Sequence, residues 1–342
     1  MTWDHPMPAR PVVAVAGATG AVGVEMLRVL EQRGFPAREV RALASSRSAG
    51  RRVPFAGGEL VVEEMTGSSF EGVDIALFSA GAAVSKRFRA AVELAGCVMI
   101  DNSSAFRMEE GVPLVVPEVN PEDAALHAGV IANPNCSTIQ MVVALKPLHD
   151  LSPIRRVVVS TYQAASGAGQ AAMDELYEQS GDFLAGRDFE PHNFVHRIAF
   201  NCIPQIDVFL DDASTKEEWK MVVETQKIMH APRIRVAATC VRVPVLRCHS
   251  ESVNVEFDGP VSLKEARAAL EAAPGVTMLD DPADNVYPMP GLLEGTDDTF
   301  VGRLRSDPSV DNGIAFWVVA DQLRKGAALN AVQIAELLLP KA

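Results

Sequence analysis

A glycine-rich turn between a strand and a helix limits the fold of this chain more than any other feature. The β-branched run at residues 11–16 (PVVAVA) leads directly into the glycine turn at 17–23 (GATGAVG). Apolar residues then recur at helical spacing over 22–30, and a second strand-like run follows at 40–44. This order predicts a Rossmann-type α/β domain, with helices on both faces of a mostly parallel sheet.

The apolar pattern changes character halfway along the chain. The first half has a helical pattern at 82–94 among short apolar runs at 75–78, 98–100, 114–116 and 130–132. The second half has longer strand candidates at 154–162, 234–245, 251–257 and 300–304, and helical patterns at 169–179, 215–229 and 263–272. We therefore expect a second, α+β domain with an extended antiparallel sheet. A last helix at about 322–339 is expected to return to the first domain.

Composition and charge exclude several classes of protein. With 48% hydrophobic and 22% charged residues among 342, the chain has enough apolar surface to fold, which excludes intrinsic disorder. The net charge of −13 argues against binding to nucleic acid or to an anionic membrane. No apolar run approaches the roughly 20 residues of a membrane span, and the N-terminus does not resemble a signal peptide.

Five scattered cysteines without CxxC spacing indicate a cytoplasmic protein that has no disulfide framework. We also expect no metal site. The pair His192 and His196 has the spacing of helical metal ligands, but no glutamate follows the first histidine and Pro191 precedes it.

The glycine turn is a candidate dinucleotide site. Glycines let the backbone turn tightly and approach a pyrophosphate, whose charge the helix N-terminus stabilises. The alternative is a tight turn between strand and helix that binds no ligand, since the spacing is GxxGxxG rather than GxGxxG. The predicted contacts are Gly17, Thr19, Gly20, Ala21, Val22 and Gly23.

The end of the second strand favours NADP over NAD. NAD-binding proteins usually place an acidic residue there to hold the ribose hydroxyls. This chain has Ser46, Arg47 and Ser48 instead, whose hydroxyls and guanidinium suit a 2′-phosphate. The alternative is an ordinary solvated basic loop.

Cys136 is a candidate nucleophile. It lies in the segment NPNCSTIQ (133–140), directly before the helical pattern at 139–148. A helix N-terminus favours the thiolate, which is the reactive form of cysteine. The alternative is a small buried hydrophobic residue, which is how we interpret the other four cysteines.

Six motifs follow one another along the chain: DNSSAFRM (101–108), NPNCSTIQ (133–140), TYQAASGAGQ (161–170), ETQKI (224–228), CVRVPV (240–245) and HSES (249–252). Together they resemble the aspartate-semialdehyde dehydrogenase family, and the resemblance runs from about residue 11 to 339. The related N-acetyl-glutamyl-phosphate reductases share the architecture but differ in the cysteine motif. The resemblance implies NADPH-dependent, reversible conversion of L-aspartyl 4-phosphate to L-aspartate 4-semialdehyde and phosphate, in lysine, threonine and methionine biosynthesis.

The resemblance also implies a role for individual residues. Cys136 is then the nucleophile that forms a thioester, His249 the general acid and base, and Gln163 the residue that orients the substrate. Contacts to the nicotinamide are implied for Ser166, Gly167 and Gln322. 

The substrate carries three charged groups that need partners of opposite charge. Arg242 can bind the carboxylate, Glu224 the ammonium group, and Arg107 and Lys227 the phosphate. Glu224 and Lys227 lie on the helix expected at 215–229. The alternative is that Lys220, Glu224 and Lys227 form a charged stripe exposed to solvent, and Lys220 is the residue that we most expect to face solvent.

Arg242 and His249 can serve one site only if the chain bends between them. They are seven residues apart, so a straight strand would point them to opposite faces and separate them by about 23 Å. Pro244 cannot donate a hydrogen bond to a sheet. We predict a turn or bulge between residues 244 and 249.

These expectations combine into one domain plan. Residues 1–135 form the NADP-binding domain, which 322–342 complete, and 136–321 form the catalytic and dimerisation domain of a homodimer. Two alternatives remain: a reductase that uses the same thioester chemistry on another acyl donor such as a CoA thioester, and a catalytically silent relative that serves as a binding subunit.

Overall fold

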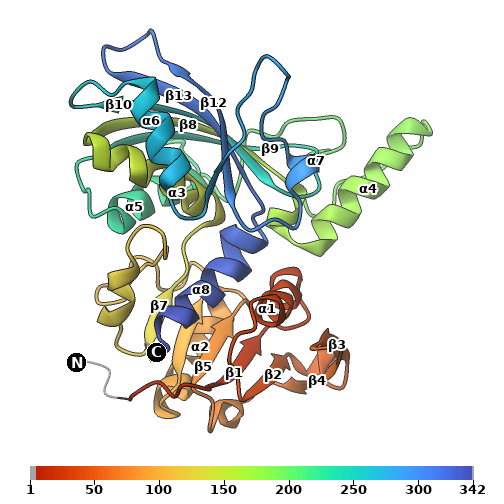
Figure 1. Cartoon of the computed structure of the whole chain (residues 1–342). Coiled ribbons are helices and arrows are strands. Elements are labelled where there is room, and N and C mark those ends of the chain that lie inside the picture. Colours follow the sequence, from red (N-terminus) through yellow and green to blue (C-terminus); the bar gives the residue numbers. More distant parts are fainter. Residues whose placement is uncertain (1–4, 341–342) are drawn as a thin grey trace. The chain divides into compact units, whose positions relative to one another are not determined.

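The computed structural model describes residues 5–340 and divides into two compact units. The first unit contains the chain up to Asn135 and again from Ala327, and the second contains Cys136–Gly326 (Figure 1). From the sequence, we expected the chain to re-enter the first unit at residue 322. That position is wrong by five residues, because Gln322 forms its side-chain hydrogen bonds with residues of the second unit.

The first unit is a seven-stranded sheet in the order β3-β4-β2-β1-β5-β6-β7. All neighbours pair in parallel except β3 and β4, which form an antiparallel hairpin. The strands are β1 (Val12–Ala16), β2 (Glu39–Ala44), β3 (Arg52–Phe55), β4 (Gly58–Glu64), β5 (Ile75–Phe78), β6 (Val98–Asp101) and β7 (Val130–Ala132). The helices are α1 (Ala21–Gln32), α2 (Ala82–Leu94) and α8 (Leu329–Leu337), with short 3₁₀ turns at Ser46–Ser48, Gly67–Phe70 and Pro121–Leu126.

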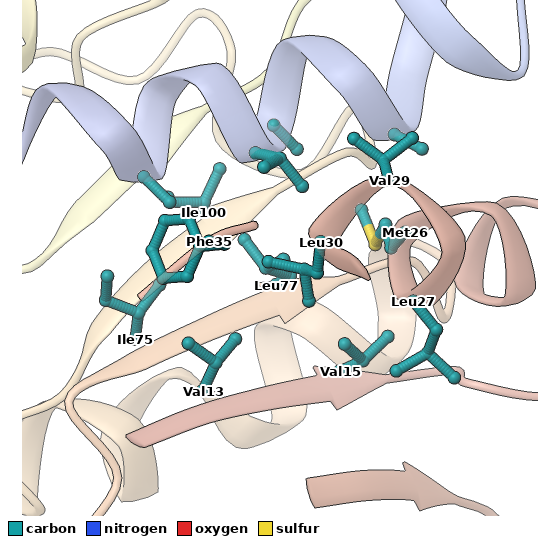
Figure 2. Close-up of a cluster of buried hydrophobic side chains, with 14 of the residues drawn as sticks. Val13, Val15, Met26, Leu27, Val29, Leu30, Phe35, Ile75, Leu77 and Ile100 are labelled. Atoms are coloured by element: carbon teal, nitrogen blue, oxygen red, sulfur yellow. The ribbon is translucent and has the colours of Figure 1, made fainter. Parts of the chain in front are cut away.

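Alternation along the strands places helices on both faces of this sheet. Val13, Val15, Ile75 and Leu77 share one core with apolar residues of α1 and α8 (Figure 2). Phe78 points to the other face, where it stacks on Phe70, which in turn meets Phe88 of α2. The expected Rossmann-type fold with a returning C-terminal helix is therefore present.

The second unit is built on a six-stranded mixed sheet in the order β11-β12-β13-β10-β8-β9. Helix α3 contacts both α5 and α6, and all three helices contact the sheet. The strands are β8 (Ile154–Gln163), β9 (Arg235–Arg242), β10 (His249–Phe257), β11 (Val276–Met278), β12 (Thr299–Ser306) and β13 (Gly313–Ala320). The helices are α3 (Cys136–Leu151), α4 (Gln170–Leu184), α5 (Lys216–Ile228), α6 (Leu263–Ala272) and α7 (Pro290–Leu293), with a 3₁₀ turn at Ala165–Ala168.

Several local expectations were wrong. The run 114–116 is not a strand, because only Leu114 forms a bridge, to Ala132. The second sheet is not purely antiparallel, since β8 and β9 pair in parallel, as do β11 and β12. The expected single helix at 322–339 is a π-helical turn at Arg324–Ala328 followed by α8. Among residues 5–340, no helix is both long and apolar enough to cross a membrane.

Candidate functional site

Cys136 is the first residue of α3 and is half-buried. At this position the dipole of the helix, whose positive end lies at its N-terminus, favours the thiolate form. The other cysteines have different surroundings. Burial raises the pKa of Cys97 and Cys240 far above the usual value and that of Cys248 to about 12, whereas Cys202 is exposed.

The chain bends between Arg242 and His249, as the sequence predicted. Strand β9 ends at Arg242 and β10 begins at His249, and the two strands pair with opposite edges of β8. Pro244 is the centre of a γ-turn, in which the N–H of Val245 donates to the carbonyl of Val243 at 2.8 Å. The connection thus crosses the end of β8, and Arg242 and His249 reach the same end of the sheet.

Ala164 holds both side chains through its backbone. Its carbonyl accepts a hydrogen bond from Nη1 of Arg242 at 2.6 Å, and its N–H donates to Nδ1 of His249 at 3.1 Å. Gly167 faces the same two side chains. A Cβ atom at Gly167 would lie 2.7 Å from Nη1 of Arg242 and 3.0 Å from Cε1 and Nε2 of His249. Only glycine fits here without moving them.

His249 is completely buried and neutral. Burial lowers its pKa well below the usual value, and the nearby Arg242 guanidinium lowers it further. Because Nδ1 accepts the N–H of Ala164, the ring proton belongs on Nε2, a nitrogen that has no partner in the described chain. The imidazole therefore presents an N–H donor beside Gly167.

Arg242 is a buried cation whose electrostatic neighbours include the nucleophile candidate. Burial lowers its pKa, while the charges of Cys136 and Glu217 oppose that effect. A thiolate at Cys136 and the guanidinium of Arg242 thus stabilise each other. This pairing favours a reactive sulfur and a cation that can also bind an anionic substrate group.

Gln163 lies beside Arg242 in the register of β8 and β9 and is buried. Its Nε2 atom donates to Glu217 Oε1 and to Thr161 Oγ1, both at 3.3 Å. Sequence reasoning did not find Glu217. The available signal was its position seven residues before Glu224, which places both carboxyl groups on one helix face.

The charged face of α5 is not a solvated stripe. Glu224 is buried, and Lys227, three residues later, is half-buried. The expectation that Lys220 faces solvent is wrong. Its ammonium group forms ion pairs with Asp207 at 2.8 Å and Glu217 at 3.1 Å, and these carboxylates raise its pKa despite the opposing effect of burial.

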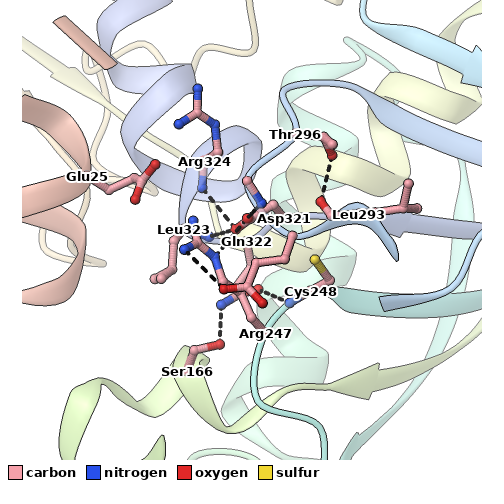
Figure 3. Close-up of polar contacts among 12 residues, drawn as sticks. Glu25, Ser166, Arg247, Cys248, Leu293, Thr296, Asp321, Gln322, Leu323 and Arg324 are labelled. Atoms are coloured by element: carbon pink, nitrogen blue, oxygen red, sulfur yellow. Dashed lines mark hydrogen bonds and ion pairs between the residues drawn. The ribbon is translucent and has the colours of Figure 1, made fainter. Parts of the chain in front are cut away.

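Gln322 bonds the turn that carries Ser166. Its Nε2 atom donates to Ser166 Oγ, and its Oε1 atom accepts the N–H of Cys248 at 2.8 Å (Figure 3). The preceding residue, Asp321, is buried, forms an ion pair with Arg247 at 2.8 Å and accepts the N–H of Leu323. These contacts fix Gln322 next to the residue that precedes His249.

The turn after Gln322 also contacts the nucleophile candidate. A Cβ atom at Gly326 would lie 2.8 Å from Cβ of Cys136 and 3.2 Å from Cβ of Gln322. The second unit therefore brings together most of the predicted catalytic and nicotinamide-contacting residues. They are Cys136, Gln163, Ser166, Gly167, His249 and Gln322, with Arg242 and the additional Glu217.

The glycine turn lies in the first unit, between β1 and α1. Gly17 has φ +90°, and a Cβ there would meet the carbonyl oxygen of Ser79 at 2.4 Å. At Gly23 a Cβ would meet the carbonyl oxygen of Gly17 at 2.1 Å. Gly20 is exposed, with Thr19, Ala21 and Val22 half-buried around it. The closely packed turn thus leaves backbone accessible at the start of α1, as pyrophosphate binding requires.

The predicted adenosine-end residues form the 3₁₀ turn Ser46–Ser48 after β2. The hydroxyl of Thr19 in the glycine turn lies 3.5 Å from that of Ser48, so the two loops are adjacent. Arg47 is exposed and has no ion-pair partner anywhere in residues 5–340. Its guanidinium is therefore available to an anionic ligand.

Arg107 is buried in the first unit, where it bonds backbone carbonyls. Its Nε atom donates to the carbonyl of Asn133 at 3.0 Å and its Nη2 to that of Asn102 at 2.8 Å. These bonds hold the backbone of the first unit at Asn102 and Asn133. The positive charge also opposes the rise that burial causes in the pKa of Asp101.

Comparison with known proteins places both units in one family. Residues 12–127 match the family described as semialdehyde dehydrogenase, NAD binding domain, and residues 145–325 match semialdehyde dehydrogenase, dimerisation domain. The aspartate-semialdehyde dehydrogenase of Aquifex aeolicus is 54% identical over 331 residues, which are 96% of this chain and 97% of that protein. That of Bacillus subtilis is 52% identical over 334 residues, or 95% and 96% of the two chains.

Solved structures agree with these matches. Aspartate semialdehyde dehydrogenase II of Vibrio cholerae, complexed with ASA, superposes with a TM-score of 0.93 at 49% identity, covering 96% of this chain and 98% of that one. The Candida albicans enzyme with NADP has a TM-score of 0.72 at 25% identity, covering 96% and 98%. The chain therefore belongs to the aspartate-semialdehyde dehydrogenase family of oxidoreductases.

Proposed function

We propose that this enzyme reduces L-aspartyl 4-phosphate to L-aspartate 4-semialdehyde with NADPH, reversibly, and releases phosphate. One observation carries the proposal. Cys136, at a helix N-terminus, interacts electrostatically with Arg242, and both Arg242 and His249 form a hydrogen bond with the backbone of Ala164. Such a group of residues suits acyl transfer to sulfur. We also propose a role in lysine, threonine and methionine biosynthesis, as the family resemblance implies.

Cys136 performs the covalent chemistry in this proposal. Its thiolate sulfur attacks the acyl carbon, a C–S bond forms, and the C–O bond to phosphate breaks, so that phosphate leaves with the bonding electron pair and takes up a proton from solvent. Ser166, Gly167 and Gln322 would hold a nicotinamide cofactor, which would supply the hydride that reduces this thioester. The C–S bond then breaks, the aldehyde leaves, and Cys136 is again a thiolate.

His249 and Gln163 assist at the acyl group. The Nε2–H of His249 lies in a buried site, where a donor directed at developing negative charge on the acyl oxygen is most effective. The family resemblance also makes His249 our candidate for the general acid and base when the thioester forms and when the aldehyde is released. Gln163, fixed by Glu217, is suited to orient the substrate beside the sulfur.

The charged groups of the substrate have candidate partners. Arg242 offers a buried guanidinium to the α-carboxylate, and Glu224 offers a carboxylate to the ammonium group. Arg107 and Lys227 are proposed for the phosphate. An aspartyl phosphate carries all three charged groups, whereas a CoA thioester without an α-amino acid does not. An enzyme that requires all three groups therefore distinguishes the two substrates.

The first unit fits NADP. The tight glycine turn at the start of α1 is suited to the pyrophosphate, and the exposed guanidinium of Arg47, with Ser46 and Ser48, is suited to a 2′-phosphate. Ser166, Gly167 and Gln322 are proposed for the nicotinamide. A cofactor bound there supplies the hydride, and the chain's residues hold it.

We also propose a homodimer, which the match to a dimerisation domain over residues 145–325 supports. A cytoplasmic location follows from the proposed chemistry, because Cys136 acts only while it stays reduced.

The reverse reaction tests the proposal. Aspartate semialdehyde, inorganic phosphate and NADP⁺ should give NADPH, and omission of phosphate should abolish steady turnover. Replacing phosphate by coenzyme A provides the specificity control. Turnover with coenzyme A and none with phosphate would contradict the proposed substrate.

A further inference from the structure

Glu251 is a buried acid that the proposed chemistry leaves without a role. It lies two residues after His249 on β10, so both side chains are on the same face of the strand. Glu251 is 0% exposed, and neither carboxyl oxygen has a hydrogen-bond partner within residues 5–340. A buried charge with no partner is costly, so this group requires an explanation.

Gln140 connects the neighbourhood of Glu251 to the site. It lies on α3 four residues after Cys136, one turn along the same helix face, and is fully buried. Its Nε2 atom donates to the carbonyl oxygen of His249 at 3.4 Å. Among the described residues, its Oε1 atom has no hydrogen-bond partner. Gln140 therefore links the first turns of α3 to the first residue of β10.

The hydrogen bonds around Glu251 lack one donor. The carboxyl group is close enough to the Gln140 amide for that amide to oppose the effect of burial on the carboxyl pKa, which burial raises well above its usual value. Both oxygens of Glu251 and Oε1 of Gln140 are acceptors, and none of the three has a hydrogen-bond partner in the part of the chain that the structure describes. A proton on the carboxyl group supplies the missing donor.

The other neighbours of Glu251 offer no compensating positive charge. In the sheet it lies opposite Thr161 of β8 and Val318 of β13, and Cys240 lies beyond Thr161 on β9. The ionisable thiol among these, Cys240, is itself kept neutral by burial. On α3 the facing polar group is Gln140, and no cation contributes to the carboxyl pKa.

We propose that Glu251 is a neutral positioning residue that donates its proton to Oε1 of Gln140. Gln140 in turn holds the backbone of His249. This chain of two hydrogen bonds fixes the start of α3, where Cys136 lies, against the start of β10, where His249 lies. The proposal deepens the proposed function, on which it rests for the meaning of the Cys136–His249 geometry.

Three variants separate this role from simple packing. Glu251→Gln keeps a donor for Gln140 and removes the ionisable group. Glu251→Leu keeps a side chain of similar size and removes the donor. Val253→Ala, two residues further along the same buried face, is the matched control for general loss of packing.

The first readouts need no substrate. We expect the infrared spectrum of the intact protein to contain the carbonyl band of a protonated carboxylic acid at pH 8, and Glu251→Gln to lack it. We expect Cys136 to react with iodoacetamide at the wild-type rate in Glu251→Gln and Val253→Ala, and about tenfold more slowly in Glu251→Leu, as loss of one positioning hydrogen bond implies. The pH profile of alkylation should be unchanged in Glu251→Gln.

Turnover of aspartate semialdehyde is then measured for the same variants. Glu251→Leu should lower kcat by about tenfold with little change in KM, and Glu251→Gln should restore kcat. Equal damage in Glu251→Gln and Glu251→Leu, or wild-type alkylation in Glu251→Leu, would overturn the proposal. If the infrared and alkylation results are as expected but the wild type does not turn over aspartate semialdehyde, the proposed function fails and the linkage stands.

Discussion

Arg242 and His249 are bound to opposite ends of one residue, since Ala164 accepts a hydrogen bond from the arginine and donates one to the histidine. The two side chains come from strands on opposite sides of β8 and meet over Gly167. The backbone at 164–167 is thus the common support of both groups, and the site is sensitive to small changes there.

The contact at Gly167 leads to a prediction about its replacement. In Gly167→Ala the new methyl group must displace Nη1 of Arg242 or the His249 ring, which lie 2.7 and 3.0 Å from its position. We expect kcat/KM to fall by about tenfold or more, with a loss of stability of about 1–3 kcal/mol. Steady-state kinetics and denaturant unfolding measure the two effects.

Gly181→Ala is the matched control. Gly181 lies in α4 with open space around its Cα atom, so alanine should stabilise the helix by about 0.5–1 kcal/mol and leave kcat/KM unchanged. Wild-type kinetics in Gly167→Ala would show that Arg242 and His249 do not need their observed positions.

The cysteines should differ strongly in reactivity. Burial raises the pKa of Cys97, Cys240 and Cys248, whereas Cys136 lies at a helix N-terminus near a guanidinium. At pH 7 we expect alkylation of Cys136 to be fastest, that of exposed Cys202 to follow, and the three buried thiols to stay unmodified in the native protein. Peptide mass spectrometry after timed alkylation measures each rate, and Cys202→Ser removes the competing exposed site. Equal labelling of all five would favour a catalytically silent protein.

His249 should make stability depend on pH in a defined direction. Its pKa in the folded protein is well below the usual value of about 6.5 that it regains on unfolding. Between the two values the unfolded chain binds more protons, so stability falls as the pH drops below about 6.5, by up to about 1.4 kcal/mol per pH unit. Above that pH the histidine is neutral in both states and contributes no slope.

Replacing the histidine isolates this contribution. Urea unfolding is measured for the wild type and His249→Gln at pH 7.5 and 5.5, which lie on either side of the usual histidine pKa of about 6.5. Between these two pH values, the variant should lose less stability than the wild type. His192→Gln changes an exposed histidine and should follow the wild type. Equal pH dependence in His249→Gln and the wild type would mean that His249 is not held neutral.

Arg47 should determine the preference for the phosphorylated cofactor. Removal of its exposed guanidinium in Arg47→Ala takes away a charge-assisted hydrogen bond of about 1.5–3 kcal/mol, so KM for NADP⁺ should rise by about tenfold to a hundredfold. KM for NAD⁺ should not change. Arg52→Ala removes the same charge from a surface pair with Glu59 and serves as the control. A parallel rise for both cofactors would argue against contact with a 2′-phosphate.

The sequence predicted those features that local patterns encode. The alternation of short apolar runs with helical patterns predicted the first sheet, and the odd spacing of Arg242 and His249 with Pro244 between them predicted the turn. The hairpin of β3 and β4 was missed, because its residues are mainly polar or exposed and Pro54 lies in an edge strand.

Contacts made by distant residues could not be predicted from local patterns. The backbone of Ala164 gives no sign in the sequence that it binds Arg242 and His249. Lys220 was expected to face solvent because charged residues at helical spacing usually do, yet Asp207, thirteen residues away on a loop, pairs with it. The role of Glu217 was missed because its partner Gln163 lies 54 residues away in the sequence, although the seven-residue spacing of Glu217 and Glu224 was visible.

The central claim is that Cys136 forms a thioester, and trapping that thioester tests it most directly. The enzyme is mixed with aspartate semialdehyde and NADP⁺ without phosphate, quenched in acid and digested for mass spectrometry, while NADPH formation is recorded. We predict a burst of about one NADPH per active site and an aspartyl group on the Cys136 peptide, both absent in Cys136→Ser. A burst that persists in Cys136→Ser, or an acyl group on another residue, would contradict the account.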